Sequence, residues 1–166
     1  MQDVTFQARL AAQNRFKNVN TFAAMLTRVS ILGLSCKAMD FSHVALPTIS
    51  HALENDIPEG SSQNHSTVQY LRMGDPAILQ LPAAIQWINV TGRELFQVAS
   101  RGDTVVSGSI KTGPLWNPTK GEKLWGGNRW EFWRQRLLYL ARRGDLDSAI
   151  SDAAIKAADN LAVILE

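Results

Sequence analysis

Tryptophan is concentrated in one part of this chain, where four of its five copies lie between Trp116 and Trp133. Large aromatic side chains dominate the energetics of protein cores, so this segment is expected to pack against the body of the fold. Its second half continues as an apolar pattern with helical spacing, formed by Trp130, Trp133, Leu137, Leu140 and Ala141. The pattern predicts a helix that begins at Asn128 and ends near Gly144.

Helical periodicity also dominates the rest of the chain. Phe16, Val19, Ala23 and Leu26 share one face of a helix that runs toward Leu32, and a separate helical piece is expected over residues 6–16. Further helices are expected around residues 42–54, 81–100 and 145–164, while the polar and glycine-rich stretches 55–76 and 101–127 are expected to be loops. We therefore predict an all-α fold, a compact bundle of about five helices with two long loops, in a single domain over residues 1–166.

Polar residues are expected to begin several of these helices. Asn20 or Thr21 is placed to cap the helix that runs toward residue 32, and Gly33 is expected to stop it. Asn128 and Glu131 have the spacing of a capping box, in which each side chain satisfies a free backbone amide.

Prolines and a glycine mark further positions along the helices. Pro47 either kinks the second helix or lies near its start, and Pro82 suits the first turn of the helix over 81–100. Gly92 lowers helix stability by about 1 kcal/mol relative to alanine, which suggests close packing against another backbone. Asp145 or Asp147 is expected to cap the last helix.

Composition limits the function classes. The 166 residues are 45% hydrophobic and 19% charged, with a net charge of +2, which is typical of a globular protein and too small to imply a polyanionic partner. The single cysteine, Cys36, fits a reducing compartment. The first residues show no secretory signal, and no stretch approaches 18 uninterrupted apolar residues. A cytoplasmic protein that makes no use of a membrane is expected.

Three sequence blocks follow one another in the second half of the chain: LPAAIQWI at residues 81–88 with Gly92 behind it, GPLW at 113–116 and RWEFWRQRL at 129–137. Together with residues 20–27 and 45–54, this arrangement resembles a family of fungal proteins known only as a domain of unknown function. The resemblance implies a compact helical fold, a fungal source and a place in secondary-metabolite gene clusters. It transfers no catalytic set, and the segments 29–39 and 55–76 are longer than the family pattern.

The aromatic residues allow two interpretations. They can form plain core, or they can line a pocket in which their faces stack on an apolar or cationic small molecule. The candidates for such a pocket are Trp87, Trp116, Trp125, Trp130, Trp133 and Tyr139.

Candidate catalytic residues are few. His43, His51 and Glu54 lie in one amphipathic segment, and His51 and Glu54 share a helix face. No metal site is expected, because paired Glu-x-x-His motifs are absent. Cys36 beside Lys37 can be a nucleophile or merely structural.

No motif for phosphate, dinucleotide, serine-hydrolase, zinc-protease or nucleic-acid chemistry occurs in the sequence. The arginines at 129, 134, 136, 142 and 143 are expected to flank a solvated helix rather than bind nucleic acid. Two hypotheses remain. We favour a cofactor-independent enzyme or binding protein that cyclises or isomerises an apolar metabolite in an aromatic-lined pocket. The alternative is a non-catalytic helical interaction module or oligomeric scaffold.

Overall fold

The computed structural model describes residues 4–56, 76–101, 112–117, 126–144 and 146–166. Within these ranges the chain forms five α-helices and no strand. They are α1 (Val4–Ile31), α2 (Ser42–Leu53), α4 (Pro76–Arg101), α5 (Gly127–Arg142) and α6 (Ser148–Leu165), with a short 3₁₀ helix η1 (Lys37–Met39) before α2. The predicted all-α fold is confirmed. Most of the two predicted loops, and the side chain of Trp125, lie outside the described residues.

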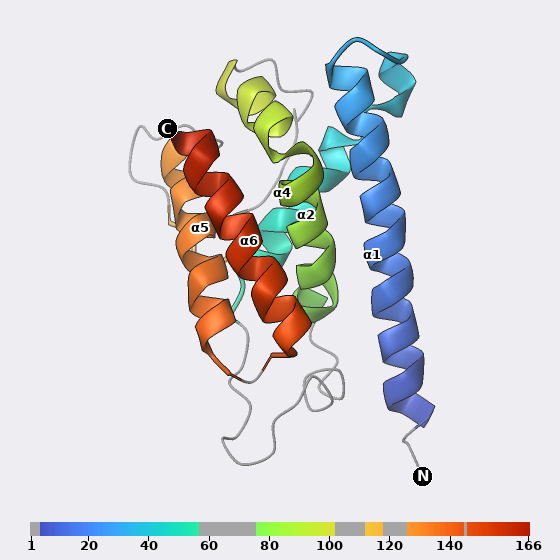
Figure 1. Ribbon diagram of the computed structural model, residues 1–166, viewed down its shortest axis with the longest axis vertical. Coiled ribbons are helices and arrows are strands. Elements are labelled where there is room, and N and C mark those ends of the chain that lie inside the picture. The colour runs from blue at the N-terminus through green and yellow to red at the C-terminus, as the bar shows by residue number, and fades with distance from the viewer. Residues whose placement is uncertain (1–3, 57–75, 102–111, 118–125, 145) are drawn as a thin grey trace.

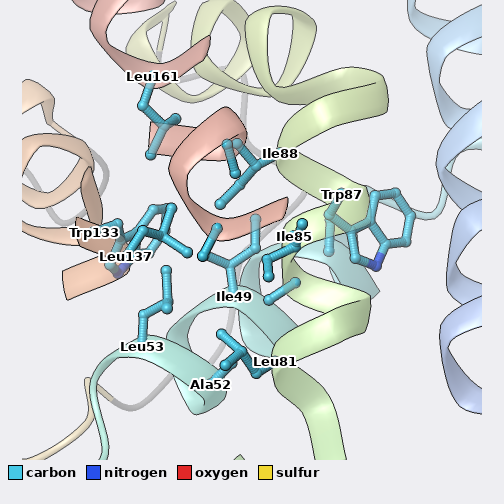
Figure 2. Packing of buried hydrophobic residues seen from close by; sticks show 14 of the residues in the cluster. Ile49, Ala52, Leu53, Leu81, Ile85, Trp87, Ile88, Trp133, Leu137 and Leu161 are labelled. Atoms are coloured by element: carbon cyan, nitrogen blue, oxygen red, sulfur yellow. The ribbon is translucent and has the colours of Figure 1, made fainter. Parts of the chain in front are cut away.

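Helix α4 occupies the centre of the fold (Figure 1). It contacts α1 on one side and α2 and α6 on the other, while α5 packs along α6. Apolar side chains of α2, α4, α5 and α6 meet in one core, which includes Ile49, Ile85, Leu137 and Leu161 (Figure 2). Helix α1 therefore lies at the edge of the molecule, attached mainly through α4.

The first helix is longer than predicted. It runs without a break from Val4 to Ile31, so Asn20 and Thr21 lie inside it and do not cap it. Their side chains instead donate to carbonyls one turn earlier, Asn20 Nδ2 to Phe16 O and Thr21 Oγ1 to Lys17 O, both at 2.8 Å. The predicted stop at Gly33 is confirmed by its φ of 74°, which an L side chain rarely adopts.

Helix α2 begins at Ser42, with Asp40 Oδ1 accepting the Ser42 backbone N–H at 2.8 Å. Pro47 lies well inside the helix, so it does not mark the start. Helix α4 likewise begins earlier than predicted, at Pro76, which leaves Pro82 in its interior rather than its first turn. Both differences arise because burial against neighbouring helices outweighs the one hydrogen bond that an internal proline removes.

A kink divides α4 at Thr91, whose φ of −137° and ψ of 16° are not helical. The neighbouring Gly92 packs closely, as its position in the apolar pattern suggests. A methyl group there would lie 3.3 Å from Ile164 Cδ1. The close neighbour is thus a side chain of α6, and the prediction of a second backbone was wrong.

The last two helices differ in how far their ends were predictable. The capping box at Asn128 was wrong, because Gly126 is the N-cap of α5 and Glu131 bonds to Arg134 and Gln135 instead. Asp147 does cap α6, accepting the Ala149 N–H at 2.8 Å. Gly144, with φ 74°, follows the end of α5 as predicted. In the described part of the chain, none of the helices has the length and apolar character needed to cross a membrane.

Candidate functional site: a buried ion pair and an exposed helix face

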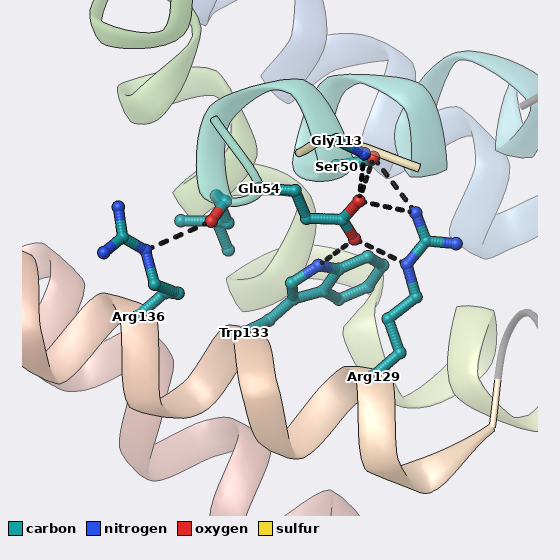
Figure 3. Close-up of polar contacts among 7 residues, drawn as sticks. Ser50, Glu54, Gly113, Arg129, Trp133 and Arg136 are labelled. Atoms are coloured by element: carbon teal, nitrogen blue, oxygen red, sulfur yellow. Dashed lines mark hydrogen bonds and ion pairs between the residues drawn. The ribbon is translucent and has the colours of Figure 1, made fainter. Parts of the chain in front are cut away.

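A fully buried ion pair joins the end of α2 to the start of α5 (Figure 3). Glu54, directly after α2, has no exposed surface, and neither does Arg129 in the first turn of α5. Arg129 Nε donates to Glu54 Oε1 at 2.5 Å, and its Nη2 donates to Glu54 Oε2 at 2.8 Å. This two-point contact matches the planar guanidinium to the planar carboxylate, which is the strongest geometry available to such a pair.

Three further donors complete the surroundings of the Glu54 carboxylate. Ser50 Oγ and the Gly113 backbone N–H donate to Oε2, and Trp133 Nε1 donates to Oε1, each at 2.8 Å. Removing a carboxylate from water is costly unless its lone pairs are satisfied, and here both oxygens have multiple donors. The Arg129 guanidinium also lies over the Trp133 ring, 5.3 Å from its centroid.

The short segment 112–117 is fixed to the same site. Leu115 N donates to the Glu54 carbonyl at 3.0 Å, and the Trp116 ring lies 5.2 Å from that of Phe132. A methyl group at Gly113 would lie 2.5 Å from both Cβ and O of Glu54, so only glycine permits this approach. The GPLW block is therefore held against the end of α2 by backbone hydrogen bonds, and it begins with glycine for a steric reason.

Helix α5 also binds backbone carbonyls at the end of α2, through the side chain of Arg136. Arg136 Nε donates to Leu53 O at 3.3 Å, and its Nη2 donates to Asn55 O at 3.4 Å. A guanidinium at a helix C-terminus satisfies free carbonyls and complements the negative end of the helix dipole. We call Ser50, Glu54, Gly113, Arg129 and Trp133 the Glu54 clamp, since together they join three separate parts of the chain.

The Glu54 clamp has the properties of a structural element. A catalytic carboxylate needs contact with substrate and a proton that can move, whereas Glu54 has no exposed surface and accepts from a guanidinium, an indole, a hydroxyl and an amide. His51, which shares its segment, is exposed and lies 3.5 Å from the Asn55 amide nitrogen, so it does not pair with Glu54. His43 is also exposed, with its ring 6.3 Å from that of Phe41.

The candidate pocket residues occupy different environments. Trp130 and Trp133 are fully buried with ring centroids 5.2 Å apart, and the Phe96 ring meets Trp130 edge-on at 5.3 Å. Trp87 is fully buried elsewhere, at the contact with α1, where its Nε1 donates to Asn20 Oδ1 at 2.7 Å. Tyr139 is exposed beneath the Arg136 guanidinium. The structure thus brings Trp130 and Trp133 together. Trp87 lies apart from Trp133, on the side of α4 that faces α1 (Figure 2).

A groove of about 400 Å³ lies between α1, α4 and the start of α6. Its lining includes Gln13, Lys17, Pro82, Gln86, Asp147 and Ile150. The residues that line it carry amide, charged and aliphatic groups but no aromatic ring. Sequence reasoning did not find this groove, because its residues come from three helices and form no contiguous pattern.

Helix α1 places polar residues inside and apolar residues outside. Its buried side includes Gln13, Asn20 and Thr27, seven residues apart, at 4%, 4% and 0% exposure, together with Ala24 at 0%. The opposite side carries Val19 and Phe22, which are 67% and 64% exposed. We call the apolar residues of this side the outer stripe; they are Val19, Phe22, Met25, Leu26, Val29 and Leu32.

The sequence contains a pattern that indicates a buried polar side of α1. A polar residue at every seventh position, Gln13, Asn20 and Thr27, is a periodic line in its own right. Each has a partner: Gln13 Nε2 donates to Ile78 O at 3.2 Å, Asn20 accepts from Trp87, and Thr27 Oγ1 accepts the Phe41 N–H at 2.9 Å. Periodicity of apolar residues alone could not show which of two faces of α1 contacts the protein.

The chain was compared with known protein families. A family model described as "Protein of unknown function (DUF3632)" matches residues 1–137. The chain belongs to this family. No curated protein and no solved structure gave a match. The DUF3632 match includes α1, α2, the segment 112–117 and the part of α5 that carries Arg129 and Trp133, so the outer stripe and the Glu54 clamp both lie inside the family region.

Proposed function

We propose that this chain is a non-catalytic helical interaction module and that the outer stripe of α1 is its docking surface. One observation carries the proposal: the side of α1 that faces away from α4 exposes a row of large apolar side chains, while Gln13 and Asn20 are buried on the other side. Exposure is 67% for Val19, 64% for Phe22 and 53% for Met25. Single exposed apolar residues are ordinary, but a contiguous row along one helix is characteristic of an interaction surface.

The Glu54 clamp supports this proposal in a different way. Two candidate site residues of the sequence, Glu54 and Trp133, make their polar contacts within the fold, with Arg129 as a further partner of Glu54. A helix that presents apolar side chains at spacings of three and four residues docks on other helices or in apolar grooves, and this requires no catalytic group.

A photo-reactive amino acid at position 22 tests the docking surface, with the same group at Ile155 as the control. Ile155 is also an exposed apolar residue of a helix, 43% exposed on α6. On irradiation in cells that produce the protein, position 22 is expected to give a discrete protein adduct identified by mass spectrometry, and position 155 none. Equal adducts at both positions, or none at position 22, would contradict the proposal.

A second candidate function is small-molecule binding, favoured by the 400 Å³ groove beside α1. Its volume lies within the range of ordinary ligand pockets. A cofactor-free cyclase or isomerase of an apolar metabolite, with a fungal source and a place in secondary metabolism, is the finer form of this proposal. For either function we propose a cytoplasmic location.

Tryptophan fluorescence tests the second candidate, because Trp87 directly follows Gln86 in the sequence and Gln86 lines the groove. A panel of terpenoids and polyketides is expected to shift the emission and raise the Tm of the wild type, and Gln86→Ala is expected to weaken both effects. Gln135→Ala, an exposed amide on α5, is the matched control. A panel that changes neither emission nor Tm would remove the support for a ligand site.

A further inference from the structure

The outer stripe has the spacing of a coiled-coil contact. Phe22, Met25, Val29 and Leu32 follow one another at alternating intervals of three and four residues, and Arg15 and Asn18 continue the series toward the N-terminus. Leu32 extends the helical pattern, because its N–H donates to Arg28 O at 3.0 Å. Within the described residues, Val19, Phe22, Met25 and Leu32 of the stripe are exposed at the edge of the molecule that α1 forms (Figure 1). Leu26 and Val29 are half-buried, and η1 packs against α1.

The charges around the stripe restrict what can bind there. From Asn18 to Leu32 the only charged residue is Arg28, and its guanidinium already pairs with Glu94 of α4 at 3.0 Å. A partner that complements this segment is therefore an apolar helix face without charges of its own. The outer stripe itself has these properties.

Helix direction is restricted by Arg15. In a parallel pair, Arg15 of one copy would face Arg15 of the other, and like charges at such positions are destabilising. In an antiparallel pair with Phe22 opposite Met25 of the other copy, Arg15 lies near the C-terminal end of the opposite α1, where the helix dipole favours a cation. The same register puts Phe22 and Met25, which are 64% and 53% exposed, at the centre of the contact.

The size of the stripe is sufficient for such a contact. Val19, Phe22, Met25 and Leu32 are each more than half exposed, and Leu34 beyond the helix is 76% exposed. Two such surfaces would bury on the order of 1,000 Å², which is about the smallest area typical of a specific interface.

We infer that the partner of the outer stripe is a second copy of this chain, bound through an antiparallel contact between the two α1 helices. The inference rests on the proposed interaction function and names the partner of that surface. The twofold axis passes between Phe22 and Met25, so each copy contributes the same residues to both halves of the interface.

Sedimentation of the purified full chain tests whether the partner is a second copy of this chain. The wild type and the matched control Ile155→Glu are expected to form dimers, while Phe22→Glu is expected to weaken the dimer at least about 30-fold, as for the loss of a central interface anchor. Circular dichroism of Phe22→Glu is expected to match that of the wild type, because Phe22 is 64% exposed in the folded chain.

The possible failures are distinguishable. If the wild-type chain remains monomeric while position 22 forms adducts with a different protein, the partner is not a second copy. The proposal that the outer stripe is a docking surface would then still hold. A dimer that Phe22→Glu does not weaken would overturn both, and so would a monomer with no adduct at position 22.

Helix direction is tested by disulfide cross-linking of two differently sized chains, each with Cys36→Ser. One carries Asn18→Cys and the other Val29→Cys. The antiparallel register is expected to give mixed dimers between the two chains in preference to Asn18→Cys dimers. Cross-links formed mainly between two Asn18→Cys chains would show parallel helices and overturn the antiparallel arrangement.

Discussion

Glu54 and Arg129 illustrate how a buried charge is accommodated at the scale of single residues. Both are fully buried, and their contact is supported by Ser50, Gly113 and Trp133. Burying two charges costs several kcal/mol each, so such a pair adds little net stability relative to apolar side chains. Its effect is asymmetric, because loss of one partner leaves the other charge buried without compensation.

Replacement of Arg129 by methionine is therefore expected to lower the free energy of unfolding by about 3–5 kcal/mol, since it leaves the Glu54 carboxylate unpaired. The matched control is Arg134→Met, which breaks the partly exposed pair with Glu131 and is expected to lower the free energy of unfolding much less, because water screens that pair. Urea unfolding followed by circular dichroism measures both. Equal losses in the two variants would show that the Glu54 clamp is not a structural element.

At the scale of helices, α1 shows most clearly what sequence reasoning could predict. The helical character, the stop at Gly33 and the periodic apolar residues all follow from local rules. The orientation does not, because the outer stripe is as regular as the buried side, and only contacts with Ile78, Trp87 and Phe41 show which side faces the protein. Apolar spacing therefore predicted the element but not its environment.

The candidate site had a similar limit. Glu54 was recognised as a candidate residue, but its partner Arg129 lies 75 positions away, whereas helical spacing pointed only to residues of the same segment, such as His51. The role of Gly113 also depends on a contact across the fold, with Cβ and O of Glu54. The helix ends at Gly144 and Asp147 were predicted correctly, because one residue decides each of them. The predicted start at Asn128 was wrong, because Gly126 is the N-cap and α5 begins before the capping box.

On the scale of the whole molecule, two parts have different roles. Helices α2, α4, α5 and α6 share the apolar core and are joined by the Glu54 clamp. Helix α1 lies at the edge of this core, to which it contributes Ala24. It is attached to α4 partly through hydrogen bonds of buried amides, and it exposes Val19, Phe22 and Met25 on its outer side. Such a division suits a stable body that presents one helix to a partner, and a second copy of the chain is the partner that fits this surface.

The concentration dependence of thermal unfolding tests association through α1 most directly, because association stabilises the folded chain by mass action. The Tm of the wild type is expected to rise with chain concentration, while that of Phe22→Glu is expected to stay constant and to equal the wild-type value at high dilution. A wild-type Tm that is the same at every concentration would contradict association through the outer stripe, as would an equal rise in Phe22→Glu.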